Sequence, residues 1–221
     1  MRLTCIALLL LVAAPASAQV QRAERLPWFV ADAHAATVGL PQAEGWVPAQ
    51  LPATTELPGR YWGVAGGATV YPVRLGKFTL GLGASIITGK GKAETLEIVG
   101  SGPTATSRVV NVVRTGMTSL VPQISVNFGH RLGWSYMSAG IGRSKVTSRA
   151  DATRTTPEIV APEAWNQALN FGGGARWFMK PRLGAGFDVR FIKLSSRSPT
   201  EMLPSAKRTQ VWNISAGISI Q

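Results

Sequence analysis

The sequence has very little of the chemistry that most enzymes and metal sites use, with one cysteine and two histidines in 221 residues. One cysteine cannot form an internal disulfide or a cysteine-based zinc site, and two histidines disfavour an all-histidine metal centre. Acidic residues are also scarce, 11 against 23 basic ones, so the formal net charge is +12. No segment reaches the roughly 18 consecutive apolar residues of a transmembrane helix. We therefore expect no metal, no cofactor and no membrane-spanning helix.

The first residues have the pattern of a secretory signal peptide. Met1 and Arg2 form a short basic start, an apolar run covers residues 6–14, and Pro15-Ala16-Ser17-Ala18 provides a cleavage motif. The apolar run is too short for the alternative, a membrane anchor helix. We expect cleavage after Ala18, a tail over residues 19–26 and one domain over 27–221. Export also makes nucleic acid a poor explanation for the basic charge.

The remaining chain alternates apolar and polar residues with the period of β-strands. In the clearest case, the apolar side chains of Leu183, Phe187 and Phe191 share one face, and Asp188 and Arg190 lie on the other. The pattern predicts eight strands, near residues 27–40, 60–73, 77–89, 107–128, 132–148, 166–179, 182–195 and 207–220. Pro122 cannot donate a ladder hydrogen bond, so it predicts a bulge in the fourth strand.

The connections between these strands alternate in length. Short turns at 74–76, 129–131 and 180–181 separate long loops near 41–59, 90–106, 149–165 and 196–206. In an up-and-down meander, all long loops then lie at one end and all short turns at the other. This asymmetry is typical of outer-membrane barrels, which have short periplasmic turns and long external loops. The predicted fold class is all-β, an eight-stranded antiparallel up-and-down transmembrane β-barrel.

Aromatic residues fall near the predicted strand ends, as expected of side chains at the two interfaces of a bilayer. The expected aromatic belts comprise Trp28, Tyr71, Phe78, Phe128, Trp134 and Trp177 at the short-turn end, with Trp62 and Trp212 at the other. Alternation alone leaves a second orientation open. A soluble periplasmic barrel of the lipocalin kind would turn its apolar faces inward around a ligand.

One hairpin resembles a known family. The segment Asn170-Phe-Gly-Gly-Gly-Ala-Arg-Trp-Phe, followed by Arg182-Leu-Gly-Ala-Gly-Phe-Asp-Val-Arg190, is similar to the penultimate hairpin of outer-membrane protein A-like β-barrel domains. The resemblance is strongest over residues 120–220, and similar small barrels occur in Gram-negative bacteria, acidobacteria among them. It implies an integral outer-membrane protein that the barrel-assembly machinery inserts, and it implies no activity. Such barrels usually end in Phe or Trp, whereas this sequence ends in Ile220-Gln221.

Charged residues on the expected inner faces form the first candidate site. We expect an ion-pair network in the lumen that comprises Arg176, Asp188, Arg190, Asp32 and His34. Eight strands leave an interior just wide enough for side chains, so the network is expected to plug the barrel. A narrow porin-like channel with a charged constriction is the alternative. A lipid-modifying enzyme would need a nucleophile beside a histidine at the outer edge of the bilayer. His130 lies in a predicted periplasmic turn, on the wrong side for that chemistry, and spacing identifies no serine partner for His34. We therefore expect no catalytic residues.

Basic residues in the long-loop half form the second candidate site. They could pair with phosphates of lipopolysaccharide at the outer rim, and they are Lys90, Lys92, Arg108, Lys145, Arg149, Arg197, Lys207 and Arg208. Ordinary solvated charge is the alternative, because Glu94, Asp151, Glu158 and other acids share these loops. We expect a monomer that contacts outer-membrane lipids and has a structural or surface-interaction role through its four long loops.

Overall fold

The computed structural model describes residues 25–42, 45–46, 55–99, 106–152, 157–161, 163–199 and 205–221, so the expected signal peptide and most of the tail lie outside the described residues. Within these ranges the chain forms nine strands and no helix. The strands are β1 (Phe29–Gly39), β2 (Arg60–Leu75), β3 (Phe78–Val99), β4 (Thr106–His130), β5 (Gly133–Ala150), β6 (Ile159–Val160), β7 (Ala164–Phe178), β8 (Leu183–Leu194) and β9 (Thr209–Ile220).

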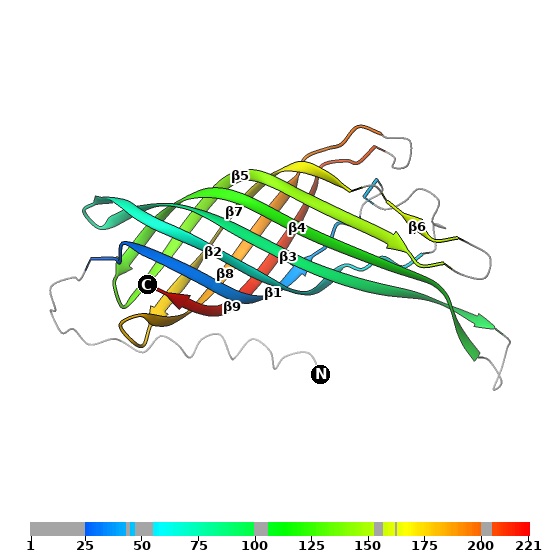
Figure 1. The fold of residues 1–221 in the computed structure, drawn as a ribbon, viewed down its shortest axis with the longest axis horizontal. Coiled ribbons are helices and arrows are strands. Elements are labelled where there is room, and N and C mark those ends of the chain that lie inside the picture. Colours follow the sequence, from blue (N-terminus) through cyan, green and yellow to red (C-terminus); the bar gives the residue numbers. More distant parts are fainter. Residues whose placement is uncertain are drawn as a thin grey trace, which may run out of the picture.

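Eight of these strands form a closed barrel in the described part of the chain (Figure 1). Each long strand pairs antiparallel with its neighbour in sequence, and pairing of β1 with β9 closes the ring. The two-residue strand β6 pairs only with Arg149 and Ala150, the last two residues of β5. The predicted eight-stranded antiparallel up-and-down barrel is therefore confirmed.

The two ends of the barrel differ in their connections. The turn end carries the short connections 76–77, 131–132 and 179–182, together with the start of β1 and the C-terminal residue (Figure 1). The loop end carries the long connections, and there β3 and β4 continue as a projecting hairpin. Among the described residues, none lies in a helix long and apolar enough to cross a bilayer.

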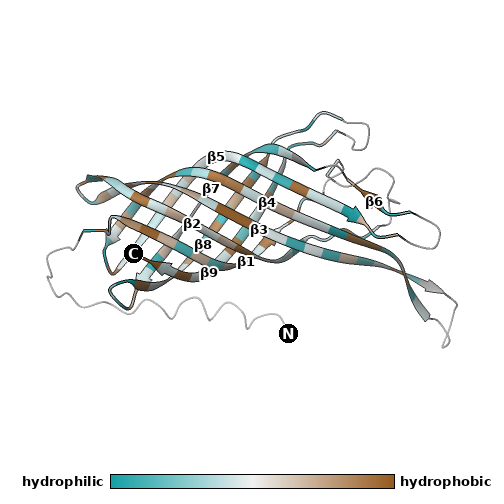
Figure 2. Ribbon diagram, in the orientation of Figure 1, coloured by the Kyte–Doolittle hydropathy of each residue, from teal (hydrophilic) through white to brown (hydrophobic). Residues whose placement is uncertain are grey.

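Hydropathy alternates along the strands, as the ribbon colours in Figure 2 show, and the large apolar side chains lie on the outside of the barrel. On β8, for example, the Phe187 side chain is exposed on the outside, whereas the next residue, Asp188, is buried inside. The same alternation holds around the ring and leaves exposed Leu82, Ile86, Leu120, Ile124, Met137, Ile141, Ile214 and Ile218. This orientation is the reverse of a soluble ligand-binding barrel.

Two details of the strand prediction were wrong. The third strand does not end near residue 89 but continues to Val99, because Lys92, Glu94 and their neighbours alternate and pair in register with β4 across most of the expected loop 90–106. Pro122 causes no register shift, since it pairs with Ala84 and the β4–β5 register is the same on both sides of it. The register shifts instead at two other places: in β2 between Val70 and Val73, where Pro72 lies, and between β3 and β4 at Thr95 and Leu96.

Candidate functional site in the barrel lumen

The middle of the lumen holds two buried ion pairs. The Arg176 guanidinium on β7 donates to both carboxylate oxygens of Asp32 on β1, with Nε–Oδ1 and Nη2–Oδ2 distances of 2.9 and 2.6 Å. Ser219 on β9 donates to the same carboxylate, at 2.7 Å. The pair joins strands that are not neighbours in the sheet and therefore spans the lumen. Its bidentate geometry offsets much of the cost of burying the two charges.

The second pair lies on one strand. Arg190 donates from Nε and Nη2 to the two carboxylate oxygens of Asp188, at 2.6 and 2.8 Å. Its remaining nitrogen, Nη1, donates to Gln123 Oε1 on β4 and to Ser138 Oγ on β5, at 2.6 and 2.7 Å. Each of the three guanidinium nitrogens thus has an acceptor, which a buried arginine requires.

Tyr136 on β5 links the two pairs. Its hydroxyl donates to Asp188, and its ring lies 4.1 Å from the guanidinium carbon of Arg176. A cation stacked on an aromatic ring and a charge-assisted hydrogen bond both gain strength away from water. Asp32, Arg176, Tyr136, Asp188 and Arg190 therefore form one connected unit, which we call the lumenal network.

Glycines provide the space for this network. In the β7–β8 register, Gly174 lies opposite Asp188, and Gly186 lies opposite Arg176. A Cβ atom on Gly174 would lie 2.1 Å from a backbone oxygen and 2.9 Å from the Tyr136 hydroxyl. On this hairpin, these charged residues therefore each lie opposite a glycine on the neighbouring strand.

His34 lies beside the network rather than in it. Its Nδ1 atom is hydrogen-bonded to Ser215 Oγ at 3.2 Å, a partner on β9 that spacing in the sequence does not reveal. The Asp32 carboxylate is bound by Arg176 and Ser219, not by the imidazole. Serine, histidine and acid are thus not aligned as a nucleophile, base and orienting group. In the described ranges, no group of three metal-ligating side chains is placed to hold an ion.

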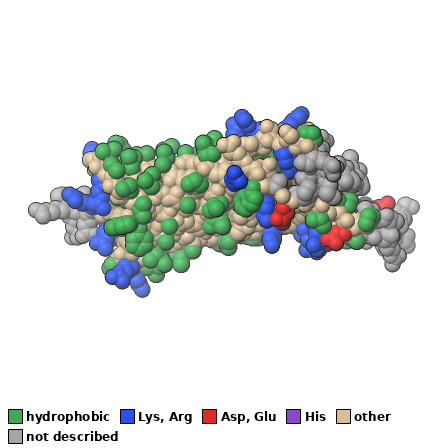
Figure 3. Space-filling view, turned by 45° about the horizontal axis from the view of Figure 1, so that its top comes forward, with side chains coloured by type: hydrophobic (Ala, Val, Ile, Leu, Met, Phe, Trp, Pro, Cys, Tyr) green, Lys and Arg blue, Asp and Glu red, His purple; other side chains and the backbone are tan. Residues whose placement is uncertain are grey.

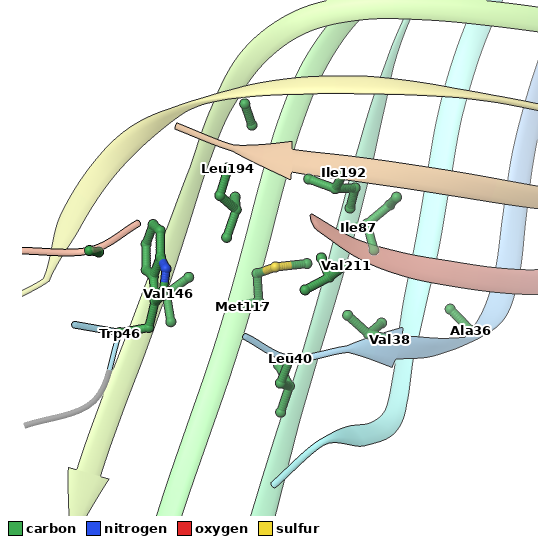
Figure 4. Packing of buried hydrophobic residues seen from close by; sticks show 12 residues of the cluster. Ala36, Val38, Leu40, Trp46, Ile87, Met117, Val146, Ile192, Leu194 and Val211 are labelled. Carbon is green, nitrogen blue, oxygen red and sulfur yellow. The ribbon is translucent and has the colours of Figure 1, made fainter. Parts of the chain in front are cut away.

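An apolar layer, not predicted from the sequence, fills the lumen on the loop side of the network. It is closed by Trp46 and Ala206 from the long connections (Figure 4). Its buried members from the strands include Val38, Ile87, Met117, Val146, Ile192, Leu194 and Val211. The one local signal is a pair of adjacent apolar residues, such as Phe191 and Ile192, where the strict alternation breaks. This layer excludes water from the loop half of the lumen.

A third layer closes the turn end and corrects the predicted aromatic belt. Tyr71 and Trp134 lie inside the barrel, only 5% and 3% exposed, and not on its outer surface. Trp134 stacks on Phe178 at a centroid distance of 5.1 Å and meets Tyr71 edge-on at 6.1 Å. Their positions at strand ends suggested a belt, but the phase of each strand turns these two rings inward. The other six predicted belt residues are exposed: Trp28, Phe78, Phe128, Trp177, Trp62 and Trp212.

The three layers leave little free volume. A cavity of about 30 Å³ lies beside the network, lined by Asp32, His34, Ser85, Arg176 and Asn213 among others. About 10–15 Å³ of volume open to a water's centre is enough for one water molecule, so this cavity has room for about two. Within the described ranges, buried side chains therefore lie inside the barrel at its turn end, its middle and its loop end.

The basic residues expected at the outer rim do not form one group. Lys90, Lys92, Lys145 and Arg149 lie on the outer face of β3 and β5, above the apolar band. Acidic neighbours pair with three of them: Lys92 with Glu94, Lys145 with Glu163, and Arg149 with Glu158. Arg114 and Arg143 also face outward here and extend this set, although they were not among the predicted rim residues.

The other four predicted rim residues lie elsewhere. Arg197 lies beside Trp46, which closes the apolar layer. Its guanidinium donates to the Gly45 carbonyl, and its guanidinium carbon lies 5.2 Å from the centre of the Trp46 ring. Arg108 is exposed on the projecting hairpin opposite Glu97, and Lys207 and Arg208 are exposed in the connection before β9.

At the end of β5, the hydrogen bond from Arg114 holds the pKa of the Asp151 carboxyl below its usual value.

Comparison with known proteins finds similar structures but no related sequence. No protein family and no curated protein matches the chain. Neisserial surface protein A is similar to 88% of this chain over 97% of its own length, with 12% identity and a TM-score of 0.45. The N-terminal β-barrel domain of Pseudomonas aeruginosa OprF matches 87% of this chain over 96% of its own, with 11% identity and a TM-score of 0.41. The outer membrane protease OmpT from Escherichia coli matches 74% over 64%, with 8% identity and a TM-score of 0.43.

Proposed function

We propose that the protein is an integral outer-membrane barrel that does not conduct ions and serves to hold its long loops at the cell surface. The observation that carries this proposal is the continuous outward band of large apolar side chains around a closed sheet. Closure leaves no unpaired sheet edge, and backbone groups paired in this way can cross hydrocarbon. Exposed aromatic rings near both strand ends fit the two interfaces of a bilayer.

The filled lumen supports a structural or surface-interaction role over a porin-like channel. An ion would have to pass an aromatic layer, a salt-bridged network and an apolar layer in series. The part best placed to meet a partner is the projecting β3–β4 hairpin, in which Lys90–Val99 pairs with residues 106–116 beyond the apolar band.

The outer rim supports contact with lipopolysaccharide as part of this proposal. Over β3, β4 and β5, the six cations Lys90, Lys92, Arg114, Arg143, Lys145 and Arg149 face outward near four acids, so the patch keeps a positive excess. Replacing Lys90, Lys92, Arg114, Lys145 and Arg149 should lower the amount of lipopolysaccharide that the protein retains on purification. Unchanged retention would contradict this part.

The experiment for the proposal as a whole is a heat-shift gel on washed outer-membrane fractions. A folded membrane barrel resists SDS until it is boiled, so unheated and boiled samples should migrate differently. Purified protein in planar bilayers should then give no single-channel steps. Recovery in the soluble fraction without a shift would contradict membrane insertion, and regular conductance steps would contradict the closed lumen.

A further inference from the structure

Among the described residues, the charged side chains at the turn end of the barrel are all basic. The described turn-end segments contain Arg25, Arg74, Lys77, Arg131, Lys180 and Arg182, and no Asp or Glu. On the face shown in Figure 3, Lys and Arg side chains gather at the left-hand, turn end without acidic side chains, whereas both signs meet at the loop end. Arg25, Arg74 and Lys77 lie around one hollow at this end. Like charges that lie close together repel one another unless a counter-charge lies between them. This cluster is therefore suited to face an anion.

Part of this charge surrounds a hollow at the barrel mouth. The hollow has a volume of about 960 Å³, and its lining includes Arg25, Arg74, Lys77 and His130, with the rings of Phe78 and Phe128. One nitrogen of Arg74 donates to the Leu26 carbonyl at 2.8 Å, which ties the residues before β1 to the end of β2. The same guanidinium lines the hollow, where bidentate binding of a phosphate suits its fork of donors.

A second, apolar hollow meets the first at Arg74. It has a volume of about 250 Å³ and is lined by Trp28, Val70, Tyr71, Pro72 and Arg74. The bulge between Val70 and Val73 forms its wall, and the Trp28 ring, 69% exposed, stands beside it. A soluble anion would use only the cationic hollow. An anion that carries a hydrocarbon chain would use both.

We propose that this corner of the turn end binds one anionic phospholipid of the facing leaflet. Arg25, Arg74 and Lys77 bind its phosphate, and the groove between Trp28 and Pro72 takes the first part of its acyl chain. Cations beside interfacial aromatic rings attract anionic lipid in this way. The inference rests on the proposed membrane insertion and adds to it the class of lipid and the residues that select it.

The test compares lipid selectivity in full-length protein. The protein is inserted into vesicles of phosphatidylcholine and phosphatidylglycerol in equal parts, extracted in mild detergent, and its retained lipid is measured by mass spectrometry. We expect enrichment of phosphatidylglycerol in the wild type. The variant Arg25→Gln/Arg74→Gln/Lys77→Gln removes the three cations and should lower that enrichment by roughly fivefold or more. A fivefold change is the effect of losing about one interfacial cation.

Matched variants separate a site from net charge. Arg108→Gln/Lys207→Gln/Arg208→Gln removes the same charge from exposed positions at the loop end and should retain the enrichment. The charge-conserving variant Arg74→Lys/Lys77→Arg should retain most of it. Equal losses in the loop-end and turn-end variants would overturn the site and leave only a charge effect.

Two further outcomes would overturn the proposal for different reasons. Displacement of the retained phosphatidylglycerol by excess soluble glycerol phosphate would show that the hydrocarbon groove contributes nothing and that the ligand is a free anion. A wild type that shows its heat shift but retains both lipids equally would overturn the lipid site alone. A wild type without a heat shift in vesicles would overturn membrane insertion, and the lipid site with it.

Discussion

The guanidinium of Arg176 stacks over the ring of Tyr136, 4.1 Å from the ring centre, and so connects an ion pair that spans the lumen to one that lies on β8. The Tyr136 hydroxyl completes the connection through Asp188. The interior is therefore one polar unit between two apolar layers, and its members should respond to substitution together.

Tyr136→Phe should destabilise the barrel by about 1.5–3 kcal/mol, because Asp188 loses a charge-assisted hydrogen bond while it remains buried. The measurement is urea unfolding of the barrel in vesicles, with the heat shift on a gel as the readout of the folded fraction. Tyr61→Phe, at the edge of the loop-end layer, is the matched control and should change little. Equal stability of the two variants would contradict a connected network.

Asp32→Ala should cost about 3–5 kcal/mol of unfolding free energy, because it leaves the Arg176 charge buried without its partner. Asp32→Ala/Arg176→Met removes both charges and should recover a large part of that loss. A double variant no more stable than Asp32→Ala would show that the pair contributes through packing and not through charge.

Met117→Ala should destabilise the barrel by about 2–5 kcal/mol through the cavity it leaves in the loop-end layer. Neither this variant nor Asp32→Ala/Arg176→Met should conduct in planar bilayers, since each leaves another layer intact. The two sets combined should still give no conductance steps, because the aromatic layer at the turn end stays intact. Conductance from the network variant by itself would mean that the apolar layer is not a barrier.

Ile124→Arg should destabilise the inserted barrel by about 2–4 kcal/mol, because residue 124 lies at the middle of the outward apolar band. Ile124 and Leu96 are similarly exposed, at 64% and 58%, but Leu96 lies on the projecting hairpin. Leu96→Arg should therefore be near neutral. Equal effects in vesicles would contradict the assigned position of the band.

Asp151 should titrate below its ordinary pKa of 3.8, since Arg114 donates to its carboxylate at 3.1 Å. Because the pKa is lowered in the folded protein, the contact between Arg114 and Asp151 stabilises the base of the projecting β3–β4 hairpin above about pH 3.8. This contribution is lost as the pH falls through the lowered pKa. Carboxyl NMR of the labelled protein measures this shift. Arg114→Gln should return the pKa toward 3.8, and Arg108→Gln should leave it unchanged.

The sequence allowed the strands to be predicted because apolar alternation and turn lengths are local properties. It allowed the inner faces of Asp32, Arg176, Asp188 and Arg190 to be assigned for the same reason. The partner of Arg176 could not be predicted, since Asp32 comes near it only when the ring closes.

Two other features depended on information that periodicity does not contain. Tyr71 and Trp134 lie at strand ends like the exposed aromatic residues, but nearness to a strand end does not show which face a ring occupies, and both rings are buried inside. The loop-end layer was missed because Ile192 and Met117 occupy inward positions in stretches whose other face is also partly apolar.

The bond between Asp32 and Arg176 has a consequence for the order in which the barrel forms. Asp32 is on the first strand, and its partners Arg176 and Ser219 are on β7 and β9, the latter the last strand of the chain. During synthesis the first strand therefore carries an unmatched charge until nearly the whole polypeptide has emerged. A truncated or mispaired chain would have to bury the Asp32 carboxylate without these two partners. The complete ring is therefore favoured in free energy over an incomplete one.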